Sequence, residues 1–207
     1  MPRRDRDARA QEIEAAAYLL MEEQAFARVG MQAIARAARA SNETLYRWYG
    51  DKIGLYRALI VRNSDLVGQA MEQAQAEGGR GCALLRAVGP ALLTMLLGER
   101  AAALHRAAAA DASGVLGRAL AELGRDFGVP RLNKVMAEAQ SAGELAKQRD
   151  GVRVIPDELT EIWLSLLIGD LQARRMIGAI APLNAAEVAR RSEQALDCLT
   201  RLYPPRG

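Results

Sequence analysis

Two short helical segments separated by a turn constrain the fold of this chain more than any other part of its sequence. Residues 31–38, "MQAIARAA", place apolar side chains at helical spacing. Residues 39–41 predict a turn, and Ser41 is a favourable N-cap for a second helix that ends at Gly50. Two helices this short, joined by about three residues, are typical of a helix-turn-helix.

A longer helix precedes this pair and another follows it. Residues 7–27 repeat apolar side chains at helical spacing, and Phe26 is expected to anchor a core. Asp51 is expected to cap a long helix that stops at glycines 78 and 79. Residues 1–50 are therefore predicted to form a three-helix DNA-binding domain of the helix-turn-helix type.

The rest of the chain, residues 51–207, is also predicted to be helical. Alanine, leucine, arginine and glutamate dominate the composition and β-branched runs are scarce, which favours helix. Asn184 and Glu187 predict a capping box at the last helix. Further helices are expected over residues 81–98, with a kink near Pro90, and over 99–111, 113–128, 130–146, 156–179 and 184–202, with a loop at 147–155. The fold class is thus all-α, with about nine helices.

Positive charge is concentrated in two short places, although the net charge is only +3. Residues 28–52 carry five basic residues against two acidic ones, and residues 1–9 carry four arginines against two aspartates. This distribution suits a small nucleic-acid-binding face. Charge alone fits an ordinary solvated surface equally well.

The chain has few groups with which to perform catalysis. It contains one histidine, two distant cysteines (Cys82 and Cys198), no phosphate-binding loop and no metal-ligand spacing. We therefore expect no enzyme, no cofactor and no metal site, and reduced cysteines in a cytoplasmic protein. The basic start leads into a charged helix, which argues against a signal peptide. The longest apolar stretch, "VGPALLTMLLG", is too short to span a bilayer, so no membrane partner is expected.

The second helix of the pair carries side chains that can read base edges. Asn bonds adenine with two hydrogen bonds, Arg bonds guanine, and the Thr methyl group contacts thymine. Polar residues suited to such contacts on exposed faces are Asn42, Glu43, Thr44 and Arg47. Leu45 and Tyr49 lie four residues apart and are expected to pack inward.

Residues 46–49 carry three aromatic rings, which cannot all face one core from a single helix. Tyr46 and Trp48 are expected to flank the groove and donate hydrogen bonds to phosphates. Lys52, at the start of the next helix, adds charge at a positive helix end. The alternative is that the aromatic residues are only the core of a small helical unit.

The segment "IARAARASNETLYRWYGDKIGLYRALI", residues 34–60, resembles the DNA-binding domain of TetR-type transcriptional regulators. The likeness covers about residues 10–60: a small-residue pair, a turn, Ser41, the Thr-Leu-Tyr run at 44–46, an aromatic pair and then Asp51-Lys52. The rest of the chain agrees in length and helical character.

The resemblance implies roles for individual positions of this sequence. It implies that Gln32, Asn42, Thr44 and Arg47 face bases and that Tyr46, Trp48 and Lys52 hold the DNA backbone. Ser41, the expected N-cap of the second helix, is counted with them among the predicted DNA-binding residues.

Three positions depart from the family pattern. Ala25 replaces a glycine after the first helix, and Gly30 replaces a Ser or Thr that caps the second helix and contacts phosphate. Arg39 replaces the turn glycine, which introduces strain of roughly 1 kcal/mol. We hypothesise that Arg39 compensates by contacting phosphate.

The second half of the chain suggests a dimer interface. The helix predicted from Pro156 is apolar over more than half its circumference, and Gly169 and Ala173 would allow close approach of another helix. Together with the apolar stripe of the final helix, this favours a homodimer through the last two helices, as in the family. A fully buried helix of a monomer is the alternative.

A ligand cavity is the third expectation for residues 51–207, which we predict to be a ligand-binding and dimerisation domain. Segments rich in small and large apolar residues can leave a pocket between helices. Candidate lining residues are Leu92, Met95, His105, Phe127, Met136, Trp163 and Leu166. Each of these, taken singly, is better explained as ordinary core.

The resulting prediction is a dimeric, ligand-responsive transcriptional regulator, most simply a repressor. Two reading helices about 34 Å apart would match a palindromic operator in double-stranded DNA, and a small, largely apolar effector would release the protein. Two alternatives stay open: a helical dimeric protein-interaction module without DNA binding, and a DNA-binding regulator without an effector.

Overall fold

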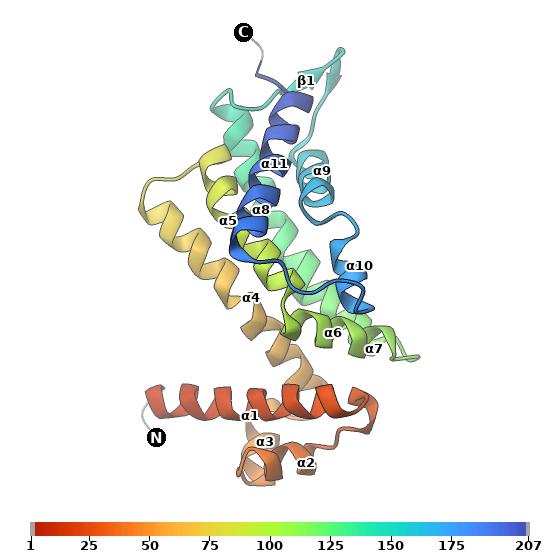
Figure 1. The fold of residues 1–207 in the computed structure, drawn as a ribbon. Coiled ribbons are helices and arrows are strands. Elements are labelled where there is room, and N and C mark those ends of the chain that lie inside the picture. The colour runs from red at the N-terminus through yellow and green to blue at the C-terminus, as the bar shows by residue number, and fades with distance from the viewer. Residues whose placement is uncertain (1–2, 206–207) are drawn as a thin grey trace. The chain divides into compact units, whose positions relative to one another are not determined.

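The computed structural model describes residues 3–205, without the side chains of residues 3–5 and of Phe127, and it is helical apart from one small hairpin (Figure 1). The elements are α1 (Arg3–Glu23), η1 (Phe26–Arg28), α2 (Met31–Ala37), α3 (Asn42–Tyr49), α4 (Lys52–Ala76), α5 (Gly81–Leu97), α6 (Glu99–Ala109), α7 (Val115–Leu120), η2 (Ala121–Arg125), α8 (Asp126–Ser141), β1 (Gln148–Arg149), β2 (Val152–Arg153), α9 (Pro156–Ile168), α10 (Leu171–Met176) and α11 (Ala185–Leu202). The all-α prediction is confirmed.

The chain divides into two units, each with its own core. The first unit is Met1–Asn63 with Ala103–Leu123, and the second is Ser64–Ala102 with Gly124–Gly207. The helices α4 and α6 are continuous across the division and contribute residues to both units. The division of functions between a DNA-binding domain at residues 1–50 and a ligand-binding and dimerisation domain at residues 51–207 remains a prediction.

The core of the first unit gathers side chains from its helices around α4. Its fully buried residues include Ile13 of α1, Ile34 of α2, Leu45 of α3 and Leu55 of α4. The later segment adds Leu104, Leu116 and other residues to the same core. The Tyr56 hydroxyl donates to the Leu104 carbonyl at 2.8 Å. Residues 103–123 are therefore part of this unit's core rather than a separate layer.

The helix boundaries around the predicted helix-turn-helix follow the expected caps. Ser41 Oγ accepts from the Thr44 amide at 3.1 Å, so α3 begins as predicted. Gly50, with a φ of 75°, follows the last residue of α3. Asp51 Oδ1 accepts from the Gly54 amide at 2.7 Å and caps α4.

A buried carboxylate ties α1 to α4 within the first unit. Glu14 is only 6% exposed, and its Oε2 lies 3.3 Å from Nε of Arg62. A buried carboxylate without a cationic partner would be strongly destabilising, so the pair fixes the register of α1 on α4.

The second unit is a bundle in which α5, α8, α9 and α11 pack against one another. Its core includes Leu93 of α5, Met136 of α8, Trp163 of α9 and Leu199 of α11, all fully buried. The Asn184 side chain and Glu187 form the predicted capping box at the start of α11.

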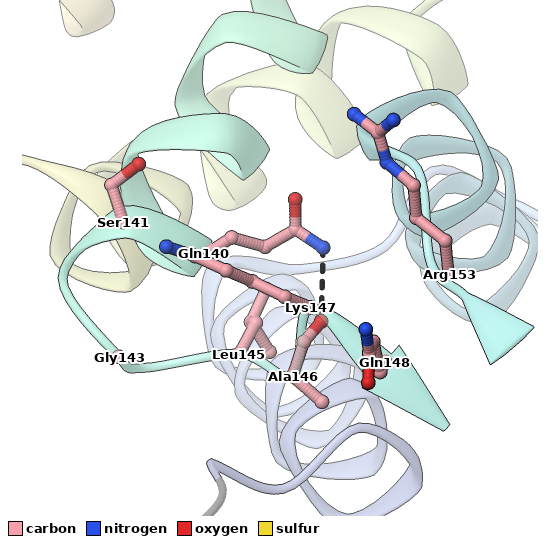
Figure 2. A pocket seen from close by; sticks show the side chains of 8 residues that line it. All are labelled: Gln140, Ser141, Gly143, Leu145, Ala146, Lys147, Gln148 and Arg153. Carbon is pink, nitrogen blue, oxygen red and sulfur yellow. Dashed lines mark hydrogen bonds between the residues drawn. The ribbon is translucent and has the colours of Figure 1, made fainter. Parts of the chain in front are cut away.

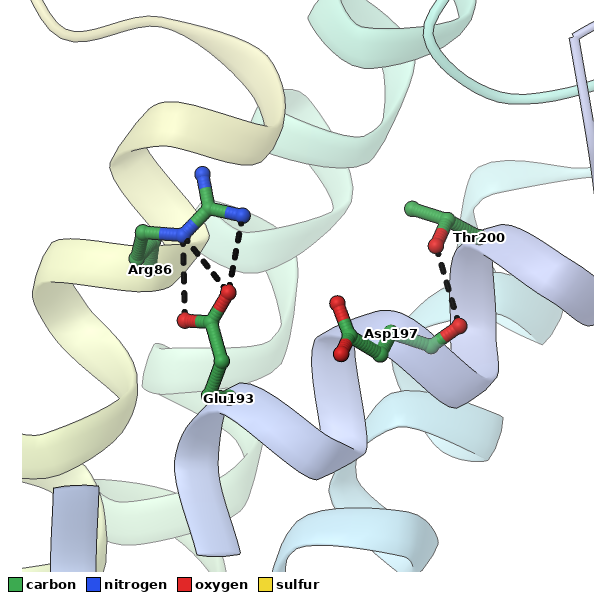
Figure 3. A network of polar contacts seen from close by, with 4 residues as sticks. All are labelled: Arg86, Glu193, Asp197 and Thr200. Carbon is green, nitrogen blue, oxygen red and sulfur yellow. Dashed lines mark hydrogen bonds and ion pairs between the residues drawn. The ribbon is translucent and has the colours of Figure 1, made fainter. Parts of the chain in front are cut away.

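Surface ion pairs and a buried arginine join the helices of this bundle. Arg86 of α5 donates from Nε and Nη2 to the Glu193 carboxylate of α11 at 3.0–3.1 Å, whereas Thr200 Oγ1 donates to the Asp197 carbonyl within α11 itself (Figure 3). Arg175 of α10 is 6% exposed; its Nε donates to the Leu97 carbonyl at 3.0 Å. It therefore bonds the last turn of α5.

The helix expected over residues 156–179 is not continuous, and that prediction was wrong. Gly169 has a φ of 52° and a ψ of −132°, a conformation that side-chain-bearing residues rarely adopt, and it separates α9 from α10. Arg191 Nη2 lies 3.0 Å from where a Cβ at Gly169 would stand. The glycine therefore ends α9, and its role in the close approach of a partner helix remains a prediction.

The loop expected at residues 147–155 contains a two-stranded hairpin. Gln148 pairs with Arg153 and Arg149 with Val152, in antiparallel register. Asp150 and Gly151 have φ values of 50° and 81°, the positive pair that a tight hairpin turn needs. The Asp-Gly sequence carried this signal.

The helices α5 and α11 approach closely at one glycine. A Cβ atom on Gly89 would lie 2.1 Å from Ser192 Oγ and 3.5 Å from Cζ2 of Trp163. A side chain is therefore excluded at this crossing unless Ser192 moves.

Among the described residues, no single helix is both long and apolar enough to cross a bilayer. Only the bent pair of α5 and α6, taken together, meets the length and composition criteria.

We expect Gly89→Ala to lower the free energy of unfolding by about 1 kcal/mol. Overpacking of about 1–3 kcal/mol outweighs a helix-propensity gain of about 1 kcal/mol. Gly68→Ala in α4 is the matched control, because its new Cβ would meet no atom within 4 Å. Denaturation followed by circular dichroism measures both variants. In a Ser192→Ala background Gly89→Ala should become neutral or stabilising, and an equal loss in both backgrounds would contradict the clash.

Candidate nucleic-acid interface

The exposed face of α3 presents polar and aromatic side chains of the kind predicted. Asn42, Glu43, Tyr46 and Arg47 are exposed, whereas Leu45 is fully buried. Gln32, in the first turn of α2, is also exposed. These side chains are free of the core and available to a partner.

Ser41 and Thr44 interact with each other at the start of α3. Their hydroxyl oxygens lie 2.9 Å apart, and Ser41 also caps the Thr44 amide. Thr44 is half-buried. Its position is therefore fixed by the cap, with the methyl group as the part that can contact a base.

Arg47 has an acidic neighbour one turn earlier on α3. Arg47 Nη1 lies 3.7 Å from Glu43 Oε1, and both side chains are mostly exposed. Such a surface pair contributes little to stability, so Arg47 can leave it to bond a base.

The prediction that both Tyr46 and Trp48 point outward from α3 holds for Tyr46 but not for Trp48. Tyr46 is 51% exposed, but Trp48 is half-buried against the core of the first unit. The guanidinium carbon of Arg6 lies 5.4 Å from the Trp48 ring centroid. Trp48 therefore joins α3 to α1.

Tyr49 packs inward, as predicted, with its hydroxyl buried. The hydroxyl has no hydrogen-bond partner, and burial raises the pKa of Tyr49 to about 12, with a smaller contribution from the nearby Glu14 carboxylate. A buried hydroxyl without a partner carries a desolvation cost.

Lys52 contacts η1 in the free protein. Its Nζ donates to the Ala27 carbonyl at 3.0 Å and lies 4.5 Å from the Phe26 ring centroid. Burial lowers the pKa of the Lys52 ammonium. A phosphate contact by Lys52 therefore remains a prediction that requires this side chain to leave or share the Ala27 carbonyl.

The two unusual positions of the motif have distinct structures. Gly30 is the N-cap of α2 with no side-chain hydrogen bond, and a Cβ there would meet no atom within 4 Å. Arg39 has a φ of 52°, in the left-handed region that disfavours side chains by roughly 1–2 kcal/mol. Its side chain is exposed.

The residues predicted to line a ligand cavity are spread over both units. His105 lies in the first unit. In the second, Met136 and Trp163 are fully buried, and Leu92, Met95 and Leu166 are half-buried. The Phe127 side chain lies outside the described residues.

Two polar atoms in the core of the second unit have no hydrogen-bond partner. They are Nε1 of Trp163 and Oγ1 of Thr160, one turn apart on α9 in fully buried residues. An unpaired buried donor costs about 1–3 kcal/mol. Sequence reasoning named Trp163 and missed Thr160.

A surface pocket of about 440 Å³ lies at the end of α8 and the hairpin (Figure 2). It is lined by Gln140, Ser141, Gly143, Leu145, Ala146, Lys147, Gln148 and Arg153. Gln140 Nε2 donates to the Ala146 and Val154 carbonyls at 2.9 and 3.0 Å, which holds the hairpin on α8. None of the predicted lining residues borders it.

Among the side chains that the structure describes, no cluster of three or more His, Cys, Asp or Glu residues could hold a metal ion. Cys82 is half-buried, and burial together with the Glu144 carboxylate raises its pKa to about 12, so its thiol stays protonated at neutral pH.

An N-capped, exposed α3 preceded by α2 and a tight turn defines a helix-turn-helix, and sequence comparisons place the chain among transcriptional regulators. A profile of bacterial regulatory proteins of the tetR family matches residues 13–59. A profile of the C-terminal domain of AefR-like transcriptional repressors matches residues 83–205. The chain belongs to the TetR family of DNA-binding transcriptional regulators, which are not enzymes. Comparison with curated protein sequences gives no significant match.

Solved structures share this fold over nearly the whole chain. A protein from Mesorhizobium loti assigned to the TetR family is 21% identical with a TM-score of 0.73, covering 98% of this chain and 99% of its own. A TetR transcriptional regulator from Agrobacterium tumefaciens is 25% identical with a TM-score of 0.71, covering 95% of each chain. The flavonoid-responsive regulator FrrA is 25% identical with a TM-score of 0.67, covering 97% of this chain and 100% of its own.

Alkaline pH should destabilise the protein through Tyr49. Because the folded-state pKa of about 12 exceeds the unfolded value near 10, the unfolded state loses its proton first as pH rises between these values. Between pH 9 and pH 12, we expect the free energy of unfolding of the wild-type protein to fall by about 1–2 kcal/mol more than that of Tyr49→Phe. At pH 7 the variant should be neutral or more stable, because it removes an unpaired buried hydroxyl. Urea unfolding at each pH measures this, and parallel pH dependences would contradict it.

Proposed function

We propose that this protein is a repressor that binds a palindromic operator as a homodimer and is released by a small, largely apolar effector. The observation that carries the DNA-reading part is the exposed face of α3, where Asn42 and Arg47 stand clear of the core behind the Ser41 cap. A helix that begins with such side chains suits the major groove.

A homodimer through α9 and α11 would supply the twofold symmetry of the operator. Four residues of the stripe assigned to this interface from sequence, Val188, Ala195, Leu196 and Leu199, lie in the chain's own core. A partner would therefore meet the exposed residues of α11, among them Cys198 and Leu202, the fifth residue of that stripe. The isologous contact of a C2 dimer would set the spacing of two α3 helices near one turn of DNA, about 34 Å.

The effector is proposed to bind the second unit. In support, the matching C-terminal profile is that of transcriptional repressors, and FrrA, with 25% identity, is a flavonoid-responsive regulator. The unpaired Trp163 Nε1 and Thr160 Oγ1 offer hydrogen-bonding groups among apolar side chains. They suit an apolar molecule that carries a hydrogen-bond acceptor, because the Trp indole only donates.

Chain continuity gives the effector a physical route to the DNA. The helices α4 and α6 each belong to both units, so a change in the second unit acts on helices whose other ends are part of the first. An effector that binds one conformation more tightly than the other would shift the population away from DNA.

Recovery of bound sequences from random genomic fragments tests the DNA part of the proposal. We expect the retained fragments to share an inverted repeat. Failure to retain any DNA at low salt would favour a protein-interaction module, and a single unrepeated half-site would refute the dimeric reading.

On the recovered sequence, Arg47→Ala should weaken binding by about tenfold or more, through loss of a base contact of about 1–3 kcal/mol. Its effect should shrink on DNA altered at the contacted base pair. Arg153→Ala, an exposed arginine of β2, controls for the loss of one positive charge. Fluorescence anisotropy with labelled duplexes measures both, and equal effects of the two variants would refute base reading by α3.

Effector binding should quench or shift the fluorescence of Trp163. In a Trp48→Phe variant Trp163 is the remaining tryptophan, so a panel of flavonoids and other apolar compounds can be screened directly. We expect a compound that changes this emission also to release the wild-type protein from its operator. Thr160→Val, in which the side chain keeps nearly the same shape, should lower the affinity for that compound by several-fold through loss of one hydrogen bond. Release without any change at Trp163 would place the effector elsewhere.

A further inference from the structure

The turn between α2 and α3 depends on a residue that is not glycine. Arg39 is one of two non-glycine residues with a positive φ in the described part of the chain. The amide of Ala40 donates to the Ala35 carbonyl at 2.8 Å and closes the turn. Because Arg39 lies only two residues before the Ser41 cap, its backbone conformation sets the direction in which α3 starts.

A side chain from α1 holds this turn from outside the helix pair. Nη2 of Arg9 donates to the carbonyl oxygen of Arg39, and Nη1 of Arg9 pairs with the Glu12 carboxylate on α1 itself. Glu12 thereby orients the planar guanidinium whose other amino group reaches the carbonyl. The orientation of that carbonyl follows from the backbone of Arg39, so the bond favours the left-handed turn over its alternatives.

A second arginine of α1 contacts the other end of α3. Arg6 lies over the ring of Trp48 at 5.4 Å and three residues before Arg9 in the chain. A cation over an indole face is attractive. Thus α1 contacts both the turn that precedes α3 and its second-to-last residue.

We propose that Arg9 is a positioning residue for DNA binding. It holds the left-handed turn at Arg39 and so fixes the orientation of α3, and it contributes no phosphate contact of its own. The inference rests on the proposed role of α3 as the reading helix. It also reassigns part of the basic segment at residues 1–9, whose charge alone suggested a direct interaction with DNA.

A double-mutant cycle between Arg9 and Arg39 tests the proposal. The dissociation constant for the recovered operator is measured against salt concentration for wild type, Arg9→Gln, Arg39→Gly and the double variant. We expect Arg9→Gln to weaken binding by about tenfold in the wild-type background and by less than about twofold in the Arg39→Gly background. Glycine adopts the left-handed turn without support, so the support should no longer matter.

The salt dependence separates positioning from direct contact. A positioning residue leaves the slope of the logarithm of the binding constant against the logarithm of salt unchanged. A lost phosphate contact lowers that slope by about one and costs the same in both backgrounds, and this result would overturn the proposal. Glu12→Gln is the control, since it leaves the bond to the Arg39 carbonyl available and should weaken binding far less than Arg9→Gln.

Thermal unfolding of the same four proteins measures the support that Arg9 gives to the turn independently of DNA binding. If the wild-type protein retains no DNA, the reading role of α3 is refuted. The unfolding midpoints of the four proteins then decide whether Arg9 supports the turn. The midpoint of unfolding should then fall on Arg9→Gln in the wild-type background and change little in the Arg39→Gly background. Additive changes in both DNA affinity and midpoint would show that Arg9 does not support the turn.

Discussion

The conformation of the turn between α2 and α3 governs what the first unit can present to a partner. Arg39 must occupy a region of backbone space that its side chain disfavours, and Ser41 must start α3 immediately afterwards. Two contacts hold α3 and the turn before it. Leu45 of α3 is buried in the core, and Arg9 of α1 donates to the carbonyl of Arg39 in the turn. Recognition of DNA by the exposed side chains of α3, as proposed, would depend on these contacts to orient the helix that carries them.

Local rules in the sequence predicted most of the helical framework. The caps at Ser41, Asp51 and Asn184 act over three or four residues, so the sequence around each was sufficient to place the helix start. Apolar spacing likewise identified Phe26 and Leu45 as core residues. The exposed face of α3 followed from the same periodicity, which is why Asn42 and Arg47 were correctly expected to be exposed.

Features that depend on distant contacts could not be predicted in this way. Gly169 fits a helix pattern locally, and only its positive φ beside Arg191 shows that α9 ends there. Trp48 is directed inward by α1, a helix about 40 residues earlier, and Lys52 contacts a carbonyl of η1. The hairpin at Asp150 differs, because its Asp-Gly turn was a local signal that the prediction did not use.

The discontinuous make-up of the first unit has a consequence for biosynthesis. Its core includes Leu104 and Leu116, and the Tyr56 hydroxyl bonds the Leu104 carbonyl, so about half of the chain must leave the ribosome before this core is complete. A nascent chain of residues 1–63 would expose the apolar surface of α4 that these residues cover. The core of the first unit is therefore complete only after the segment 103–123 has been made, when synthesis has passed the middle of the protein.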